Sequence, residues 1–110
     1  MLDLHTFKEH IMDELNGART YIDMAIESKI NHPSWSYMFC KMADMEADHA
    51  GNLMRMLEQY IKANPENISE TKMVGDVEQR NMVNPEEVYA ELMKEFGETM
   101  TYVTNMKRGL

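Results

Sequence analysis

Apolar residues recur every three or four positions along two long runs of the chain, and only a short break separates the runs. This spacing is typical of helices that pack one face against a core. The break is Asn31-His32-Pro33-Ser34, where the proline disfavours helix in the residue before it. Because a short connection joins antiparallel neighbours, we predict an antiparallel helix pair over residues 4–29 and 34–63.

A third helix is predicted over residues 85–107. It follows Asn84-Pro85-Glu86-Glu87, where asparagine can cap the helix, proline fits the first position and acids favour the first turn. Residues 65–84 are polar and poorly periodic, so we expect a long crossover there, with at most one short helical turn, linking two parallel helices. The 110 residues therefore predict one all-α domain (1–110), a helical bundle.

Each predicted helix carries an acid on its apolar stripe. The three stripes are Leu4, Phe7, Ile11, Glu14, Ala18, Tyr21 and Ala25; Phe39, Met42, Glu46, His49, Leu53, Leu57 and Tyr60; and Val88, Leu92, Glu95, Thr99, Tyr102 and Met106. Glu46 and His49 lie three positions apart, so their side chains leave the helix on the same side. We therefore predict that this Glu-x-x-His pair faces the core.

Acids on a core stripe need a partner. An ionised carboxylate in an apolar interior costs several kcal/mol unless it is paired or binds a metal. Several acids and a histidine at one level of a bundle indicate a shared cation. Iron and manganese suit mixed carboxylate and imidazole ligands, and zinc can also bind them. Glu14, Glu46 and His49 are the first candidate ligands.

The first and third helices align with an offset of 81 residues. Met12-Asp13-Glu14-Leu15 matches Met93-Lys94-Glu95-Phe96, and Thr20-Tyr21-Ile22 matches Thr101-Tyr102-Val103. The alignment makes Glu95 a fourth, weaker ligand candidate, for which a polar residue on the bundle seam is the alternative. If it reflects a true repeat, a fourth helix resembling the second is missing.

Glu14 with Tyr21 seven residues later, followed by Glu46-Ala47-Asp48-His49 on the next helix, resembles the ferritin and rubrerythrin superfamily. There, each half of a four-helix bundle supplies one Glu from one helix and a Glu-x-x-His from the next. The resemblance implies a di-iron site with Glu14, Glu46 and His49 as ligands and Tyr21 behind them. Tyr102 is the corresponding candidate on the third helix, and core packing is the alternative for both tyrosines. The same resemblance also implies ferroxidase activity, or reduction of oxygen or peroxide.

The chain departs from that pattern because it has no second Glu-x-x-His motif. Its other histidines, His5, His10 and His32, lack a Glu three residues before them. One chain therefore cannot supply the usual ligand set, but a homodimer can. The resemblance is then to the short ferritin-like proteins, such as the encapsulated ferritins, whose site forms at a subunit interface.

The net charge of −8 argues against nucleic acid and anionic membranes as partners. No apolar run approaches the roughly 20 residues that span a bilayer. The single cysteine, Cys40, excludes an intrachain disulfide, and no signal-peptide pattern is visible, so we expect a cytoplasmic protein. The alternative function is a helical oligomeric interaction protein that keeps the fold without a catalytic metal.

Overall fold

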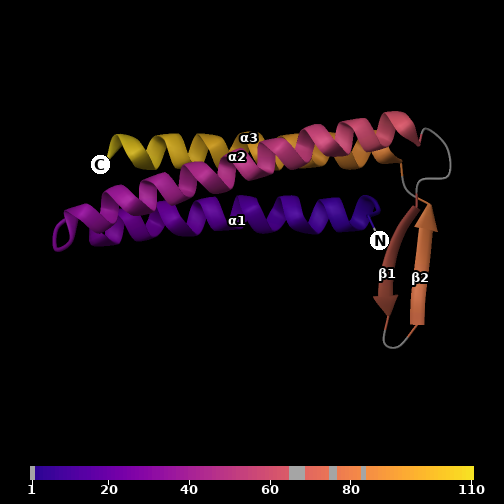
Figure 1. Cartoon of the computed structure of the whole chain (residues 1–110), viewed down its shortest axis with the longest axis horizontal. Coiled ribbons are helices and arrows are strands. Elements are labelled where there is room, and N and C mark those ends of the chain that lie inside the picture. The colour runs from indigo at the N-terminus through magenta and orange to yellow at the C-terminus, as the bar shows by residue number, and fades with distance from the viewer. Residues whose placement is uncertain (1, 65–68, 75–76, 83) are drawn as a thin grey trace.

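The computed structural model describes residues 2–64, 69–74, 77–82 and 84–110. Its elements follow the order α1 (Leu4–Ser28), α2 (Pro33–Ala63), β1 (Ser69–Val74), β2 (Val77–Met82) and α3 (Pro85–Arg108). The three helices lie along the long axis of the molecule, and α1 and α2 run in opposite directions (Figure 1). The predicted helical bundle is confirmed, and each helix begins and ends within one residue of its predicted position.

The start of α3 shows why the local sequence forms a helix there. The Asn84 side chain accepts hydrogen bonds from the backbone N–H groups of Glu86 and Glu87, at 3.0 and 3.4 Å. These two donors would otherwise lack an intrahelical partner. Pro85 occupies the first turn, and Lys107 and Arg108 occupy the last. The cap is the one that the sequence predicts.

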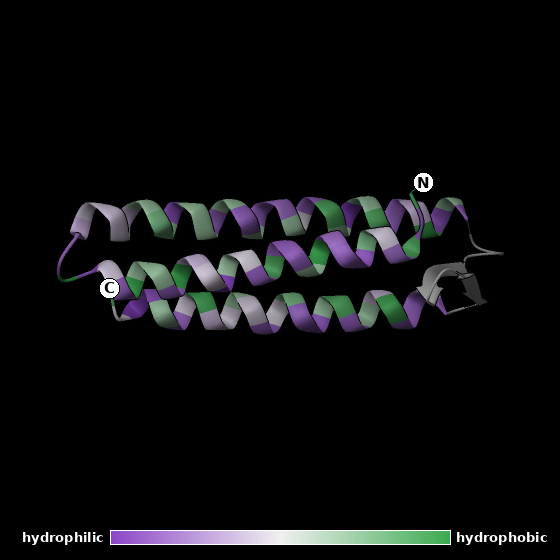
Figure 2. Ribbon diagram, turned by 90° about the horizontal axis from the view of Figure 1, so that it is seen from below, coloured by the Kyte–Doolittle hydropathy of each residue, from purple (hydrophilic) through white to green (hydrophobic). Residues whose placement is uncertain are grey.

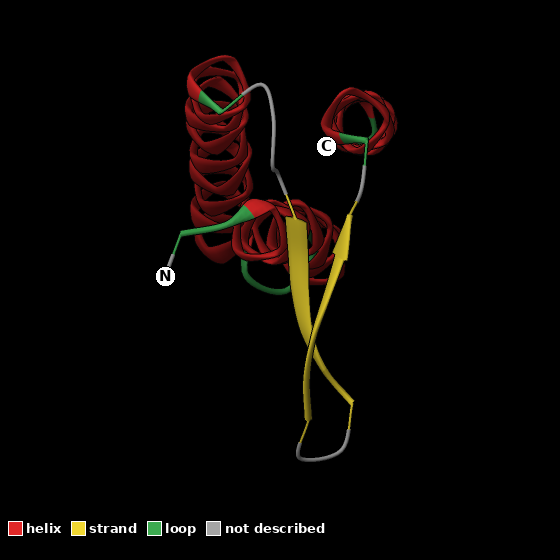
Figure 3. Cartoon of the chain, turned by 90° about the vertical axis from the view of Figure 1, so that its right-hand side faces the viewer, coloured by secondary structure: helices red, strands yellow, loops and turns green. Residues whose placement is uncertain are grey.

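The connection between α2 and α3 differs from its prediction in two ways. First, α3 begins at the end of the bundle where α2 ends, so these helices are antiparallel and the expected crossover between parallel helices is wrong (Figure 1). Second, the expected irregular segment contains an antiparallel hairpin, in which Ser69 pairs with Met82 and Val74 with Val77. The hairpin extends away from the helices, beside the N-terminal end of α1 (Figure 3).

The core is built mainly between α1 and α2. Large side chains of α1, including Leu4, Ile11, Leu15 and Ile22, are fully buried. The buried line of α2 consists of smaller residues in its middle, namely Ala43, Ala47 and Ala50, followed by Met54 and Leu57. From α3 only Leu92, Thr99 and Val103 are buried. Small residues let helices approach closely, so the alanine line sets how α2 lies on α1.

Each helix has an apolar side and a polar side, which appear as alternating green and purple bands along the ribbons (Figure 2). Such amphipathic helices bury one face and leave the other in water. Over the part of the chain that the structure describes, no helix combines the length and the apolar character that crossing a membrane requires.

Candidate metal centre

α1 and α2 bring together the three residues that the sequence analysis proposes as ligands. One oxygen of Glu14, one oxygen of Glu46 and one ring nitrogen of His49 all lie within 4.8 Å of one another. In the described part of the chain, no other set of three His, Cys, Asp or Glu side chains converges in this way. Two helices that are sequence neighbours therefore form one compact cluster of oxygen and nitrogen donors.

One oxygen of Glu14 is enclosed by the surrounding side chains. This atom, Oε2, is buried and has no hydrogen-bond partner within the described chain. The nearest cationic candidate is Nδ1 of His49, at 3.4 Å, and the exposed fractions of the two side chains are 27% for Glu14 and 53% for His49. A buried acceptor without a donor costs about 1–3 kcal/mol. A bound cation would satisfy this oxygen directly.

The Glu46 carboxyl group lies against that of Glu14. A hydrogen bond to Glu14 is the largest effect that raises the pKa of Glu46 above its ordinary value, burial and the negative charge of Glu14 add to it, and His49 opposes it. Two carboxylates this close cannot both be ionised without cost. A divalent ion between the two carboxylates would remove this repulsion.

The backbone of α1 leaves room for Glu46. An ideal Cβ placed on Gly17 would lie 3.0 Å from Oε2 of Glu46. Together with the unpartnered oxygen of Glu14, this close approach makes the cluster a fitting place for a metal ion. Two carboxylates and one imidazole are ligands that iron and manganese accept, and zinc can bind the same set.

The expected inward orientation of the Glu-x-x-His pair is only partly right. The alanines of α2 face α1, and Glu46 and His49 stand beside that line, at the edge of the core. Glu46 is half-buried and His49 is exposed. The alanine line brings the helices close, and the longer side chains project along the flank. The cluster therefore opens on the surface of a single chain.

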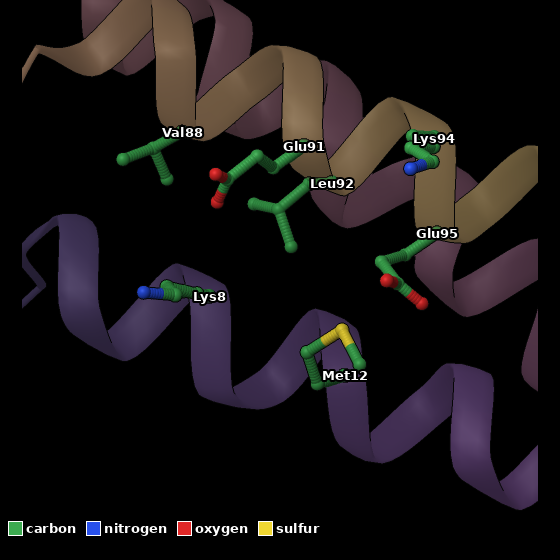
Figure 4. A pocket seen from close by; sticks show the side chains of 7 residues that line it. All are labelled: Lys8, Met12, Val88, Glu91, Leu92, Lys94 and Glu95. Carbon is green, nitrogen blue, oxygen red and sulfur yellow. The ribbon is translucent and has the colours of Figure 1, made fainter.

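Glu95 does not join the cluster. It lines a cavity of about 380 Å³ between α1 and α3, together with Lys8, Met12, Val88, Glu91, Leu92 and Lys94. Its side chain projects from α3 toward the side of α1 that carries Met12 (Figure 4). The offset of 81 residues aligns Glu95 with Glu14, but Glu95 is not among the ligand atoms that converge within one chain. A ligand role for Glu95 stays a prediction.

The two tyrosines make packing and hydrogen-bonding contacts. The ring of Tyr21 stacks on Phe39 of α2, with 6.4 Å between ring centroids. The Tyr102 hydroxyl donates a hydrogen bond to Asp23, and Arg19 lies over the Tyr102 ring at 5.2 Å from its centroid. Tyr102 therefore joins α3 to α1 through these two contacts.

Sequence reasoning missed the part played by Gly17. Glycine within a helix costs about 1 kcal/mol relative to alanine. Three positions before it stands Glu14, so a small residue next to a candidate ligand was visible in the sequence. What the sequence could not show is that the side chain facing Gly17 across the helix pair is Glu46.

Comparison with known proteins agrees with the geometry of the cluster. A family model described as rubrerythrin matches residues 7–109, which is nearly the whole chain. Searches among curated proteins and among solved structures gave no match. The matched range contains all three residues of the cluster and all but the first turn of the helical bundle. The chain belongs to the rubrerythrin family, within the ferritin-like superfamily.

Proposed function

We propose that the chain is a di-iron carboxylate protein whose metal site is completed by a second copy of the chain, and that it acts as a ferroxidase or in the reduction of oxygen or peroxide. The convergence of Glu14, Glu46 and His49, with ligand atoms within 4.8 Å of one another, carries this proposal. Membership of the rubrerythrin family supports iron as the metal. Manganese and zinc are the alternatives that the ligand types allow.

The ligand set in one chain is half of the set that a ferritin-like bundle provides. A full set contains two Glu residues and two Glu-x-x-His motifs from four helices. The chain contributes Glu14 and one such motif, and His49 is exposed at the surface. A second copy against this surface would supply the other half and would cover His49.

A second apolar stripe on α2 supports the same partner. It is separate from the buried alanine line and consists of Trp35, Met38, Met42, Met45, Leu53, Met56 and Tyr60, interrupted only by His49. Trp35, Met38, Met45 and Met56 are between 49% and 56% exposed. We call these residues the outer stripe. Their three- and four-residue spacing is that of a helix seam, which packs against another helix.

Part of the outer stripe is symmetric about the Glu-x-x-His motif: Trp35 mirrors Tyr60 and Met42 mirrors Leu53, whereas its other three methionines have no mirror partner within the stripe. Its first and last members, at positions 35 and 60, lie equally far from the middle of the Glu46–His49 pair. If two copies pair antiparallel about that point, Trp35 meets Tyr60, Met42 meets Leu53, and Glu46 meets His49. These pairs support a two-fold dimer, in which the same surface of each copy faces the other.

The side chains have distinct roles in this site. Glu14 and Glu46 would hold the ions through their carboxylate oxygens, and His49 of each copy would contribute a nitrogen ligand. The chemistry that bound iron supplies is electron transfer, which couples oxidation of ferrous iron to reduction of oxygen or peroxide. The apolar side chains of the outer stripe would exclude water around the ligands, which strengthens the interaction of each carboxylate with a cation.

Elemental analysis combined with native mass tests the proposal. We expect stoichiometric iron on a dimer or larger assembly after loading with ferrous iron. Glu46→Ala and His49→Ala should each lose the metal. Asp48→Ala is the matched control. Asp48 lies between Glu46 and His49 in the sequence of α2 but is exposed on the polar side of the helix, so this variant should keep the metal.

Two other outcomes would decide against the proposal. A monomer that binds metal stoichiometrically would contradict the shared site. An assembly that takes up no iron, manganese or zinc under any loading condition would favour the alternative, a helical interaction protein that keeps the fold without a catalytic metal.

A further inference from the structure

We propose that Gly17 is a positioning residue for the metal centre, because the side chain that it lacks would occupy the space in which the Glu46 carboxylate lies. The inference rests on the proposed function, and it concerns a residue of α1 that has no ligand atom in its side chain. Glycine disfavours helix relative to alanine. The Glu46 side chain, which lies against Gly17, explains why a glycine stands within α1.

The end of the Glu46 side chain covers Gly17. A Cβ on Gly17 would meet Oε2, Cδ and Cγ of Glu46 at 3.0, 3.3 and 3.4 Å. A contact of 3.0 Å between a methyl carbon and an oxygen is shorter than ordinary van der Waals contact, so the carboxylate would have to move. The atoms involved belong to the far end of a flexible side chain, and the backbone of α2 can stay where it is.

The other two glycines within the helices differ from Gly17. A Cβ on Gly51 would meet the Phe96 ring no closer than 3.8 Å, which is ordinary contact, and a Cβ on Gly97 would meet nothing within 4 Å. Only at Gly17, among these three, does an added methyl group press on a candidate ligand.

A methyl group at position 17 should therefore harm the metal site and spare the fold. Displacement of the Glu46 carboxylate would change its distances to Glu14 and His49, whose ligand atoms now lie within 4.8 Å of it. The helix itself gains from alanine. This opposite response of site and fold separates a positioning role from a purely structural one.

The test uses the full chain, freed of metal, and Mn²⁺ as the probe. Wild type, Gly17→Ala and Gly17→Val are compared with the controls Gly97→Ala and Gly97→Val. We expect Mn²⁺ binding by calorimetry to weaken roughly 10- to 100-fold in Gly17→Ala, the loss typical of disturbed support around a metal ligand, and further in Gly17→Val. The absorption bands of bound Co²⁺ should shift in both variants. The Gly97 variants should bind as wild type does.

Thermal unfolding and native mass of the metal-free variants complete the test. We expect Gly17→Ala to unfold no earlier than wild type and to keep its oligomeric state. Mn²⁺ affinity equal to that of wild type would overturn the inference, and so would loss of the metal-free assembly, which would assign Gly17 to helix packing. If wild type itself binds neither Mn²⁺ nor Co²⁺, the proposed function fails instead.

Discussion

At the scale of single residues, the candidate ligands destabilise the metal-free chain and favour metal binding. Oε2 of Glu14 is buried without a hydrogen-bond donor, next to a second carboxyl group. Such an arrangement destabilises the metal-free chain, because the buried acceptor has lost its water. Acids held together in this way are typical of sites whose function outweighs their cost to folding.

We therefore predict that Glu14→Gln stabilises the metal-free protein. The amide removes one negative charge and can donate a hydrogen bond to Glu46, so the free energy of unfolding should rise by about 1 kcal/mol. Denaturant unfolding in the presence of a chelator measures this change. Glu91→Gln, at an exposed acid of α3, is the control and should stay within about 0.5 kcal/mol of wild type. Lower stability of Glu14→Gln would show that the unpartnered Oε2 atom does not destabilise the metal-free chain.

The raised pKa of Glu46 predicts a pH dependence of stability. Its ordinary value is 4.5, and contact with Glu14 raises it in the folded chain. The folded chain therefore holds the proton more tightly, so this contribution to stability is present below about pH 4.5 and is lost as the pH rises through the folded pKa. Glu46→Gln cannot lose a proton. Its stability relative to metal-free wild type should increase between pH 4 and pH 7, as measured by denaturant unfolding, and a constant difference would count against a raised pKa of Glu46.

The three-residue spacing of Glu46 and His49 was enough to predict that they leave α2 on the same side. Glu14 was added from its place on the apolar stripe of the first helix and from the resemblance to ferritin-like proteins. Spacing could not predict how far each is exposed. The apolar stripe predicted for α2 lies slightly to one side of the line that is buried. The sequence pattern does not distinguish alanines from large apolar residues, so it could not show which of the two lines is buried. Which of the two lines faces α1 depends on how closely the helices approach.

At the scale of the elements, the alanine line of α2 determines the packing against α1. Ala43 and Ala50 are fully buried. We predict that Ala50→Leu, which adds three carbons in a closely packed seam, destabilises the protein by about 1–3 kcal/mol. Ala90→Leu on the exposed side of α3 provides the control, with little change expected. Thermal unfolding of both variants, without metal, checks this prediction, and a tolerated Ala50→Leu would show that α2 can move away from α1.

The hairpin is the element that the sequence analysis missed. Its strands, Ser69–Val74 and Val77–Met82, do not alternate strictly between apolar and polar residues, so the usual strand pattern is absent. A signal was available in Gly75-Asp76, which stands between Val74 and Val77 and is of the kind found in two-residue hairpin connections. The direction of α3 follows from the hairpin, because a hairpin returns the chain to the end of the bundle that it left.

At the scale of the whole molecule, the outer stripe explains several of the 13 methionines. Methionine is common in helical cores and on surfaces that bind other helices. Met38, Met45 and Met56 are exposed in a single chain and lie on the same flank of α2 as His49. A flank that is apolar over about seven turns is expected to be covered in an assembly.

The last prediction follows from that surface. Met56→Glu places a charge in the outer stripe, ten residues from Glu46, whereas Gln59→Glu places the same charge three residues further along α2 on its exposed polar face. Because an unpaired charge inside a helix seam must lose its water, Met56→Glu should weaken the dimer at least tenfold, while Gln59→Glu should leave it unchanged. Sedimentation velocity over a range of protein concentrations, with metal-free protein, measures both.

Metal binding should also be weaker in Met56→Glu than in Gln59→Glu, since half of the ligands would come from the partner. Met56→Glu should bind less Mn²⁺ per chain at low protein concentration, and its Mn²⁺ binding should recover as the concentration rises. An equal loss at all concentrations would mean that the substitution damages the site within one chain, and an undiminished dimer would place the second copy on another surface.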